Sequence, residues 1–451
     1  MRKATEHKSV PDPVEAAFAE ISRSRPLSLT TSREITVAVM GAGSRGQTYT
    51  AFGRIFPGTL RVVAVADVLK SRRDNMARLW KVPKRLRFGD FREMLKAGRG
   101  GKLADVLIVS LPDHLHYEAA MAAMRQGYDM LLEKPMARSE RECRALLERQ
   151  HETGVMVAVG HVLRYSPYFR ALKGAIDRGL VGEVASIQHQ EPVQWAHMAH
   201  SFVRGNWHNA KASTPMIVAK SCHDLDILRW LVGRRCVRVC AEGGVALFRR
   251  GKCPAGAPAR CTDGCPHEAR CPYSAVNIYV RQRRHLYVFD IPRDAPASRI
   301  LAKLRKTDYG RCVYQMDNDQ PDHIVATLLF EGGVTASFSM DAFTPWGGRR
   351  TRVMGTMGYI EGDGTTFTLY RFDTCRSYKW AFRPEDEGDY KDSGHGGGDL
   401  QLIRDFLEAV DTRDFDKLSS SFDASVESHI MGFACERSRR SRKIPEGLSR
   451  M

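Results

Sequence analysis

The sequence predicts an α/β protein with two domains, the first built on a parallel, doubly wound sheet and the second an α+β domain with a largely antiparallel, open sheet. Three observations support this fold class. Short apolar strands alternate with amphipathic helices over about the first 160 residues, and a glycine-rich turn follows the first strand. In the second half, by contrast, several strands follow one another directly. Alternating strands and helices imply parallel strands joined by right-handed crossovers, whereas consecutive strands form antiparallel hairpins.

The first domain is expected over residues 33–160, after an N-terminal extension at residues 1–32 in which only residues 14–21 show a helical period. Apolar, β-branched runs predict its strands, and amphipathic stretches predict its helices. The strands are expected at residues 35–40, 60–66, 105–110, 128–132 and 155–160, and the helices at 46–56, 70–80, 91–97, 113–126 and 139–152. The last of these helices has Ser139 as its N-cap.

The second domain is expected over residues 161–451, with a cysteine-rich insertion at about residues 249–322. Glu331-Gly332-Gly333 separates two alternating strands and predicts a hairpin turn. Helices are expected at residues 168–178, 223–231, 400–410 and 424–438, and strands at 183–190, 323–330, 334–340, 349–355, 359–362 and 367–371.

Length and composition exclude several classes of protein. A chain of 451 residues can bury two cores, and it has neither an apolar run of about eighteen residues nor an apolar signal core near its N-terminus. The net charge of +17 is scattered, and no nucleic-acid recognition motif accompanies it. We therefore expect a cytoplasmic protein with a solvated basic surface that binds neither membranes nor nucleic acid.

The glycine-rich turn has the spacing of a dinucleotide site. Gly41, Gly43 and Gly46 form a G-x-G-x-x-G motif directly after the first strand. The first glycine permits the tight turn, the second lets the backbone approach a pyrophosphate, and the third allows the helix to pack on the strand. N–H groups at the start of that helix are placed to hold the phosphates.

The end of the second strand predicts which dinucleotide is preferred. Asp67 follows this strand 21 residues after Gly46, where a carboxylate can accept hydrogen bonds from the ribose hydroxyls of the adenosine. Arg72 and Arg73 could meet the 2′-phosphate of NADP, but Asp67 would repel it. The sequence therefore favours NAD over NADP.

The insertion carries four clustered cysteines among Pro and Gly residues: Cys253, Cys261, Cys265 and Cys271. Eleven cysteines in a long chain without a secretory signal argue against a disulfide framework. A loop of this kind cannot build its own core, so a structural zinc held by the four thiolates is one interpretation. Because the spacing lacks a C-x-x-C pair, reduced loop cysteines are the other.

Four motifs together resemble the Gfo/Idh/MocA oxidoreductases, a family that includes glucose-fructose oxidoreductase and inositol dehydrogenase. They are the glycine motif, Ser110-Leu-Pro-Asp-His-Leu-His116, Glu133-Lys134-Pro135 and the segment from His223 to Gly233, in the family's order. The resemblance covers residues 35 to about 440. It implies a Rossmann domain, then a domain whose open sheet faces substrate or another subunit, and hence a homo-oligomer, a dimer or tetramer.

The resemblance also assigns roles to residues. It implies that Lys134 positions the substrate and that His223 is the general base beside the nicotinamide. The residues expected to contact the cofactor are Gly41, Gly43, Ser44, Arg45, Gly46, Asp67, Ser110, Pro112, His114, His116, Glu133 and Lys134.

One position departs from the family pattern. Family dehydrogenases usually carry Asp four residues before the histidine, where this chain has Ala219, followed by Lys220. Lys220 could supply positive charge near a carboxylate or enolate. Asp226 shares a helical face with His223 and could orient its imidazole, although a helix-capping pair explains the spacing equally well.

A loop dense in aromatic, imidazole and guanidinium groups follows the first strand of the second domain. Aromatic faces stack on sugar C–H groups while polar side chains bind hydroxyls, so the loop predicts a carbohydrate site. An interdomain hinge packed with tryptophans is the alternative. The residues expected to bind substrate, including some outside this loop, are Arg164, Tyr165, Trp195, His200, Arg204, Trp207, Lys220 and His395. His395 lies in a glycine-rich strap that opens a helix, from which it could reach the substrate. A helix-entry loop capped by Asp399 is the alternative, which explains the glycines but not His395.

Three functions are compatible with these residues. The first is oxidation of a secondary hydroxyl of a sugar, cyclitol or sugar derivative, or the reverse reduction, with hydride exchanged with NAD. The second is a redox-neutral glycosidase or lyase that oxidises its substrate transiently, eliminates a leaving group and returns the hydride. The third is a non-catalytic sugar or NAD sensor, which the presence of both Lys134 and His223 disfavours.

Overall fold

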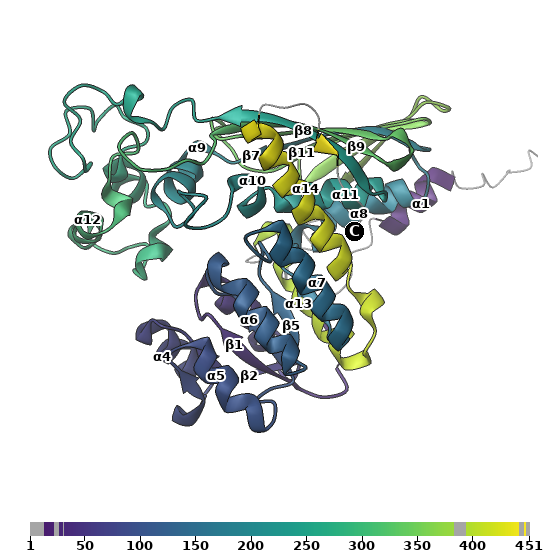
Figure 1. The fold of residues 1–451 in the computed structure, drawn as a ribbon. Helices are drawn as coiled ribbons and strands as arrows, with labels where there is room; N and C mark the ends of the chain where they lie inside the picture. Colours follow the sequence, from purple (N-terminus) through teal and green to yellow (C-terminus); the bar gives the residue numbers. More distant parts are fainter. Residues whose placement is uncertain (1–12, 22–26, 30, 383–393, 442–445, 448–451) are drawn as a thin grey trace, which may run out of the picture.

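Two sheets organise the chain, one in each half, as the computed structural model shows (Figure 1). The structure describes residues 13–21, 27–29, 31–382, 394–441 and 446–447. The first sheet has the order β3-β2-β1-β4-β5-β6, and all its pairings are parallel. Its strands are β1 (Ile35–Met40), β2 (Leu60–Ala66), β3 (Arg87–Phe88), β4 (Val106–Val109), β5 (Asp129–Leu132) and β6 (Val157–Val159). The strand order reverses between β1 and β4, so a crevice opens there at the carboxyl ends of the strands.

The helices of this half agree with the sequence pattern except near the glycine turn. They are α2 (Ser44–Thr50), α3 (Phe52–Ile55), α4 (Lys70–Leu79), α5 (Phe91–Ala97), α6 (Asp113–Arg125) and α7 (Glu140–Thr153). The single helix expected over residues 46–56 begins at Ser44 and is divided at Ala51 into α2 and α3. The Ser139 cap of α7 is confirmed, because its side chain accepts a hydrogen bond from the Glu142 N–H.

The second sheet has nine strands in the order β14-β13-β12-β11-β7-β10-β9-β8-β15. Only the pairing of β7 with β10 is parallel among those described. The strands are β7 (Val184–Pro192), β8 (Cys236–Gly244), β9 (His323–Phe330), β10 (Thr335–Asp341), β11 (Arg350–Gly355), β12 (Gly358–Gly362), β13 (Thr366–Arg371), β14 (Ser377–Ala381) and β15 (Glu446–Gly447). The predicted largely antiparallel sheet is confirmed.

One face of this sheet is covered and the other is open. Along β9, Ile324, Ala326 and Leu328 are buried while Val325 and Thr327 between them are exposed. The helices α8 (Pro167–Asp177), α11 (Cys222–Val232) and α14 (Phe422–Ser441) pack on the covered side (Figure 1). The alternation of buried and exposed residues along β9 thus indicates that one face of the second sheet is buried.

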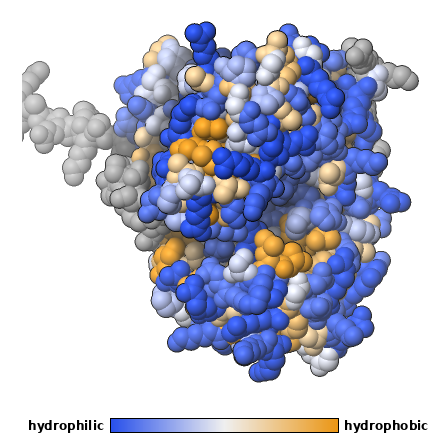
Figure 2. Space-filling model, turned by 90° about the vertical axis from the view of Figure 1, so that its left-hand side faces the viewer, coloured by the Kyte–Doolittle hydropathy of each residue, from blue (hydrophilic) through white to orange (hydrophobic). Residues whose placement is uncertain are grey.

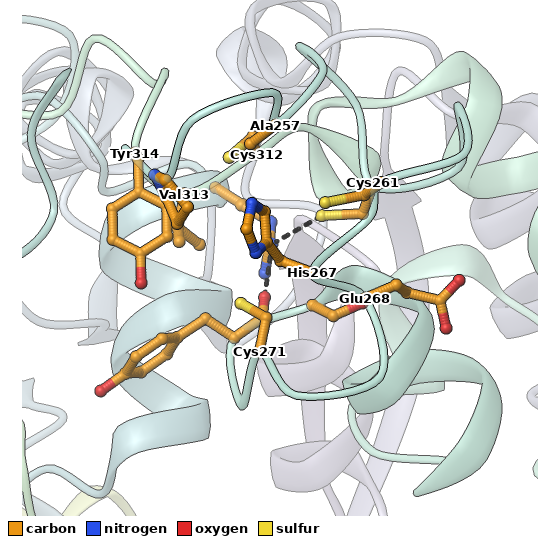
Figure 3. A pocket seen from close by; sticks show the side chains of 13 residues that line it. Ala257, Cys261, His267, Glu268, Cys271, Cys312, Val313 and Tyr314 are labelled. Atoms are coloured by element: carbon orange, nitrogen blue, oxygen red, sulfur yellow. Dashed lines mark hydrogen bonds between the residues drawn. The ribbon is translucent and has the colours of Figure 1, made fainter. Parts of the chain in front are cut away.

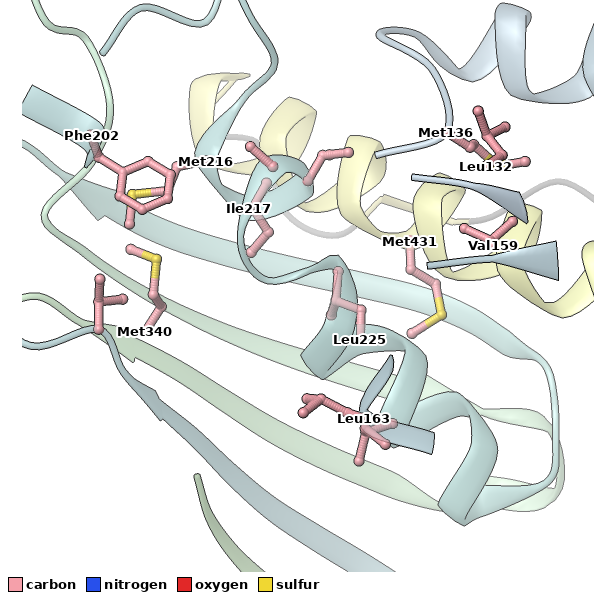
Figure 4. Packing of buried hydrophobic residues seen from close by; sticks show 14 of the residues in the cluster. Leu132, Met136, Val159, Leu163, Phe202, Met216, Ile217, Leu225, Met340 and Met431 are labelled. Atoms are coloured by element: carbon pink, nitrogen blue, oxygen red, sulfur yellow. The ribbon is translucent and has the colours of Figure 1, made fainter. Parts of the chain in front are cut away.

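Helix α14 joins the two halves. Its Met431 side chain lies between Leu225 of α11 and the first sheet, where Leu132 and Val159 end neighbouring strands (Figure 4). His429, also on α14, accepts a hydrogen bond at Nε2 from the Met136 N–H over 3.1 Å. The loop that carries Lys134 is therefore fixed to the second half by both apolar packing and a hydrogen bond.

Two other segments also connect parts that are distant in sequence. Helix α13 (Gly398–Thr412) lies beyond the boundary expected at residue 160, yet its Leu402, Ile403 and Phe406 join the core around β1. The helical period at residues 14–21 is confirmed as α1 (Pro13–Ile21), which packs on α8 and β14. No helix in the described part of the chain is long and apolar enough to cross a membrane.

The insertion forms a separate lobe beside the second sheet (Figure 1). It contains short helical turns and one longer amphipathic helix: η5 (Arg250–Lys252), η6 (Val276–Arg281), η7 (Leu286–Phe289), α12 (Ala297–Lys306) and η8 (Asp308–Gly310). Its buried side chains, among them Ile278, Phe289 and Leu304, continue the core of the second half. Figure 2 shows a hollow between this upper lobe and the first half below it.

Candidate active site

The glycine turn has no room for side chains. Gly41 has φ +94°, and a Cβ there would lie 2.3 Å from the carbonyl oxygen of Ser110. A Cβ on Gly46 would lie 2.2 Å from the carbonyl oxygen of Gly41. Ser110 Oγ donates to that same carbonyl over 2.7 Å, so β4 holds the turn against β1. This cradle at the start of α2 fits a dinucleotide pyrophosphate.

Asp67 lies beside the turn, as the spacing predicts. Its carboxylate accepts hydrogen bonds from the Ala42 and Leu69 N–H groups, each over 2.8 Å. Arg73 donates to the Asp67 carbonyl oxygen over 2.6 Å. The carboxylate is therefore fixed at the edge of the crevice where an adenosine ribose would lie.

The loops after β4 and β5 are fastened to each other. His116 is buried, with Nδ1 2.7 Å from the Pro135 carbonyl oxygen and Nε2 2.7 Å from that of Leu111. Pro112 is the N-cap of α6, and the His114 side chain is exposed. His116 therefore positions the loop carrying Lys134 rather than facing the crevice.

A buried carboxylate stands beside Lys134. Glu133 accepts from Arg45 Nε over 2.6 Å and from the Tyr49 hydroxyl. Burial opposes ionisation of Glu133, but Arg45 and Lys134 outweigh it and hold its pKa below the usual range. Arg45 is thus committed to Glu133 and to α13, and it organises the site through these contacts.

Asp399 of α13 completes this network and was missed as a site residue. Its carboxylate accepts from Arg45 Nη2 over 2.8 Å and lies 3.1 Å from His395 Nδ1. The alternative in which Asp399 caps the helix is wrong, because the N-cap is Gly397 and has no side-chain bond. Arg45 and His395 keep the pKa of Asp399 low despite its burial. The glycine-rich strap therefore places His395 in the site, where the Asp399 carboxylate holds its ring.

Lys134 and His223 come together at the crevice. Lys134 Nζ donates to the carbonyl oxygen of Ala219 over 2.8 Å, and Ala219 ends the short helix α10 (Met216–Ala219), which precedes the His223 helix α11. His223 is buried, and its Nδ1 has no hydrogen-bond partner among the described residues. Its ring centroid lies 5.7 Å from that of His395. Burial, then Lys134 and His395, hold the pKa of His223 well below its usual value, so the imidazole is neutral.

Asp226 does not orient His223. Both of its oxygens accept hydrogen bonds from Arg164, Nε and Nη2 each at 2.6 Å, and both side chains are buried. Tyr165 is also turned into the core, with its hydroxyl 2.7 Å from Ser420 Oγ. Arg164 and Tyr165 therefore differ from the prediction that they face the cleft: Arg164 supports the helix that carries His223, and Tyr165 holds the segment at Ser420.

Lys220 belongs to a chain of buried and partly buried charges that the sequence did not reveal. Its Nζ lies 3.1 Å from Glu191 Oε1 on β7, and Arg349 Nε lies 2.6 Å from Glu191 Oε2. Arg349 also donates to Asp224 Oδ1 over 2.9 Å. Arg349 Nη2, Asp224 Oδ2 and Glu191 Oε2 have no further partner among the described residues. These groups offer unsatisfied donors and acceptors beside His223, as a hydroxylated ligand requires.

The aromatic loop, which includes α9 (Trp195–His197) and the π-helical η4 (Met198–Arg204), mainly builds the insertion. The His200 ring is stacked on His285 at a centroid distance of 4.2 Å and on Tyr309 at 5.0 Å. Arg204 Nε donates to the Arg311 carbonyl oxygen over 2.7 Å. These contacts place His200 and Arg204 inside the insertion, in contrast to the predicted substrate role.

The tryptophans of this loop also make protein contacts. Trp207 Nε1 donates to Asp113 Oδ2 on α6 over 3.0 Å, which matches the alternative of an interdomain hinge. Trp195 packs edge-to-face on Tyr273. His197, in contrast, was not singled out, yet burial and then Lys220 hold its pKa well below the usual value. Its ring packs on Phe202 and His285, with centroid distances of 5.8 and 5.9 Å.

The cysteine cluster lines a small cavity in the insertion (Figure 3). Cys261, Cys265 and Cys271 share it with Cys312, and Gln315 Nε2 contacts Cys253 Sγ at 3.5 Å. In the described residues no group of three or more His, Cys, Asp or Glu side chains is placed to hold a metal. Burial raises the pKa of Cys271, and all these cysteines are free thiols. The described residues thus give no support to the zinc interpretation.

Buried histidines make stability depend on pH. Burial lowers the pKa of His161 to about 4 and that of His429 to about 3, from 6.5. Below pH 6.5 the unfolded chain takes up protons that the folded chain does not, so stability falls as the pH falls. The two histidines together should remove about 3 kcal/mol of unfolding free energy between pH 6.5 and pH 5. Urea unfolding at each pH tests this.

A matched pair of variants assigns the effect. His161→Gln should reduce the slope by about 1.4 kcal/mol per pH unit, whereas His151→Gln, at an exposed position, should leave it unchanged. Equal slopes in the two variants would show that His161 is charged in the folded protein.

Several known proteins are similar to this chain in sequence. The protein YteT of Bacillus subtilis (strain 168) is 26% identical over 385 residues, which cover 80% of this chain and 84% of that protein. The scyllo-inositol 2-dehydrogenase (NAD(+)) of the same organism is 29% identical over 214 residues, 47% of this chain and 58% of its own length. A 2,7-anhydro-N-acetylneuraminate hydratase of Escherichia coli (strain K12) is 27% identical over 143 residues, 32% of this chain and 37% of its own.

Solved structures share the fold at low sequence identity. An inositol dehydrogenase homolog from Azotobacter vinelandii, complexed with NAD+, superposes with a TM-score of 0.67 at 14% identity, covering 94% of this chain and 100% of that chain. A levoglucosan dehydrogenase in complex with NADH and levoglucosan gives a TM-score of 0.66 at 17% identity, over 93% and 100%. Residues 35–161 match the oxidoreductase family's NAD-binding Rossmann fold, and residues 173–445 match its C-terminal alpha/beta domain. The chain therefore belongs to the Gfo/Idh/MocA oxidoreductase family.

Proposed function

We propose that the protein is an NAD-dependent dehydrogenase that acts on a secondary hydroxyl of a sugar, cyclitol or sugar derivative. The observation that carries this proposal is that Lys134 lies close to His223: its Nζ donates to the Ala219 carbonyl at the end of α10, four residues before His223 on α11, and its charge acts on the His223 imidazole. A cation and a neutral imidazole side by side are the groups that oxidation of an alcohol needs. The inositol and levoglucosan dehydrogenases named above support the substrate class.

The chain's own groups account for the proton and the charge. NAD supplies the hydride acceptor when bound in the cradle of Gly41 and Gly46. His223, neutral because of its burial, accepts the hydroxyl proton. Lys134 donates a hydrogen bond to the hydroxyl oxygen and stabilises the alkoxide character that develops there. The C–H electrons leave as hydride while the carbon–oxygen double bond forms.

We propose NAD rather than NADP as the cofactor. The Asp67 carboxylate is fixed by two backbone N–H groups at the edge of the crevice. It can accept hydrogen bonds from ribose hydroxyls, whereas a 2′-phosphate would bring like charges together.

A second candidate function is a redox-neutral elimination or hydration through transient oxidation. Such a reaction needs a further base that removes the proton next to the new carbonyl. His395 is held 5.7 Å from His223, between ring centroids, and is anchored on Asp399. The similarity to a hydratase agrees with this candidate.

One assay separates the two candidates. The full chain is incubated with NAD and a panel of cyclitols, sugars, anhydrosugars and glycosides, while NADH absorbance and products are followed together. Keto product formed in equal amount with NADH is the expected result. Product without free NADH would replace it by the redox-neutral reaction, and no turnover on the whole panel would contradict both.

A further inference from the structure

The tip of the insertion reaches the NAD-binding half at a charged contact. Asp290, the residue after η7, places its Oδ1 3.5 Å from Arg72 Nη2 on α4. This contact joins the insertion to the Rossmann half. The contact is partly open to solvent, with side-chain exposures of 54% for Asp290 and 30% for Arg72.

Arg72 lies where the dinucleotide would pass. A Cβ added to Gly43 would lie 3.5 Å from Arg72 Nη1, so the guanidinium reaches over the phosphate-binding turn. It stands five residues after Asp67, at the ribose edge of the same crevice. Arg73, in contrast, already donates to the Asp67 carbonyl. Arg72 is thus the better placed of the two arginines to bind a 2′-phosphate.

The insertion tip is held rigidly in this position. Both residues that flank η7, His285 and Asp290, adopt left-handed backbone conformations, with φ 57° and 52°. Phe289 between them is buried, with its ring centroid 5.6 Å from Tyr279 and 5.4 Å from Tyr309. The packing of Phe289 therefore holds the backbone that carries Asp290 in this position.

We propose that Asp290 is a specificity residue that discriminates against NADP by occupying Arg72. A 2′-phosphate would have to displace this carboxylate and would then face both Asp290 and Asp67. NAD has no group that needs Arg72 to be free. The insertion therefore supplies part of the dinucleotide site in addition to the carboxylate at the end of β2. This inference rests on the NAD preference proposed above.

Binding measurements without substrate test the proposal. Dissociation constants of NADH and NADPH are measured by fluorescence on the full chain, with weak binding read by competition. Asp290→Asn should tighten NADPH binding about fivefold or more, with NADH affinity changed by less than about twofold. Asp294→Asn, four residues on and exposed, removes the same charge and should change neither affinity.

A double variant shows whether Asp290 affects NADPH binding through Arg72. If Asp290 acts through Arg72, the gain in NADPH affinity should vanish when Asp290→Asn is combined with Arg72→Ala. The proposal is overturned if Asp290→Asn and Asp294→Asn bind NADPH alike, or if the gain persists without Arg72. Because no turnover is involved, these outcomes stand whether or not the dehydrogenase assay succeeds. Tighter binding of NADPH than of NADH by the unaltered chain would refute the NAD preference itself.

Discussion

Replacing either Lys134 by Ala or His223 by Asn is expected to lower kcat/KM about 10²- to 10⁴-fold, the usual contribution of a positioned acid or base. Lys134→Ala removes the cation that steadies the reacting oxygen. His223→Asn removes the neutral base but keeps a polar side chain in its buried position. Steady-state kinetics on a substrate from the panel measures both effects.

NADH affinity shows whether a variant has lost the catalytic step alone or the folded structure of the site as well. Neither side chain contributes to the glycine cradle, so NADH should bind within about threefold of the unaltered protein. Lys211→Ala, at an exposed lysine, is the matched control and should keep full activity. If Lys134→Ala and His223→Asn both retained more than about a tenth of the activity, the assigned roles would be incorrect.

Asp226→Ala is expected to destabilise the protein by about 3–5 kcal/mol, because it leaves Arg164 buried without its carboxylate. Asp177→Ala, at an exposed ion pair, should cost less than about 1 kcal/mol. Denaturant unfolding gives both values. The structure assigns Asp226 to Arg164 and not to His223, so the loss should appear in stability.

An apolar pair tests the same assignment if Asp226→Ala fails to fold. Arg164→Met combined with Asp226→Leu removes both charges at similar volume and should recover most of the lost stability. Unchanged stability in Asp226→Ala together with lost turnover would instead mean that Asp226 acts on the imidazole.

Local patterns predicted most of the fold. The apolar runs of β1, β2, β4 and β5 and the alternation of β9 each report burial on one or both faces, which is a property of the segment itself. The two-residue β3 is too short to show a period. The helix expected over residues 46–56 is divided at Ala51, and this residue is not a helix breaker, so the sequence did not predict the division.

The site was predicted where it follows from a motif and missed where it depends on distant partners. Gly41 and Asp67 lie at fixed distances along one βαβ unit. The ion pairs of Arg45 with Asp399 and of Lys220 with Glu191 join residues far apart in sequence, so no motif spacing predicts them. For the same reason, the direction of Arg164 and the enclosure of His200 became visible only once the packing was known. The homo-oligomer stays a prediction.

Hydride transfer is the central claim, and isotopic labelling tests it most directly. An active substrate from the panel, deuterated at every carbon, is incubated with unlabelled NAD and the products are analysed by mass spectrometry. The proposed dehydrogenase transfers one deuterium into NADH and leaves a ketone. Deuterium absent from the cofactor at every stage, including enzyme-bound NADH after a single turnover, would contradict the account.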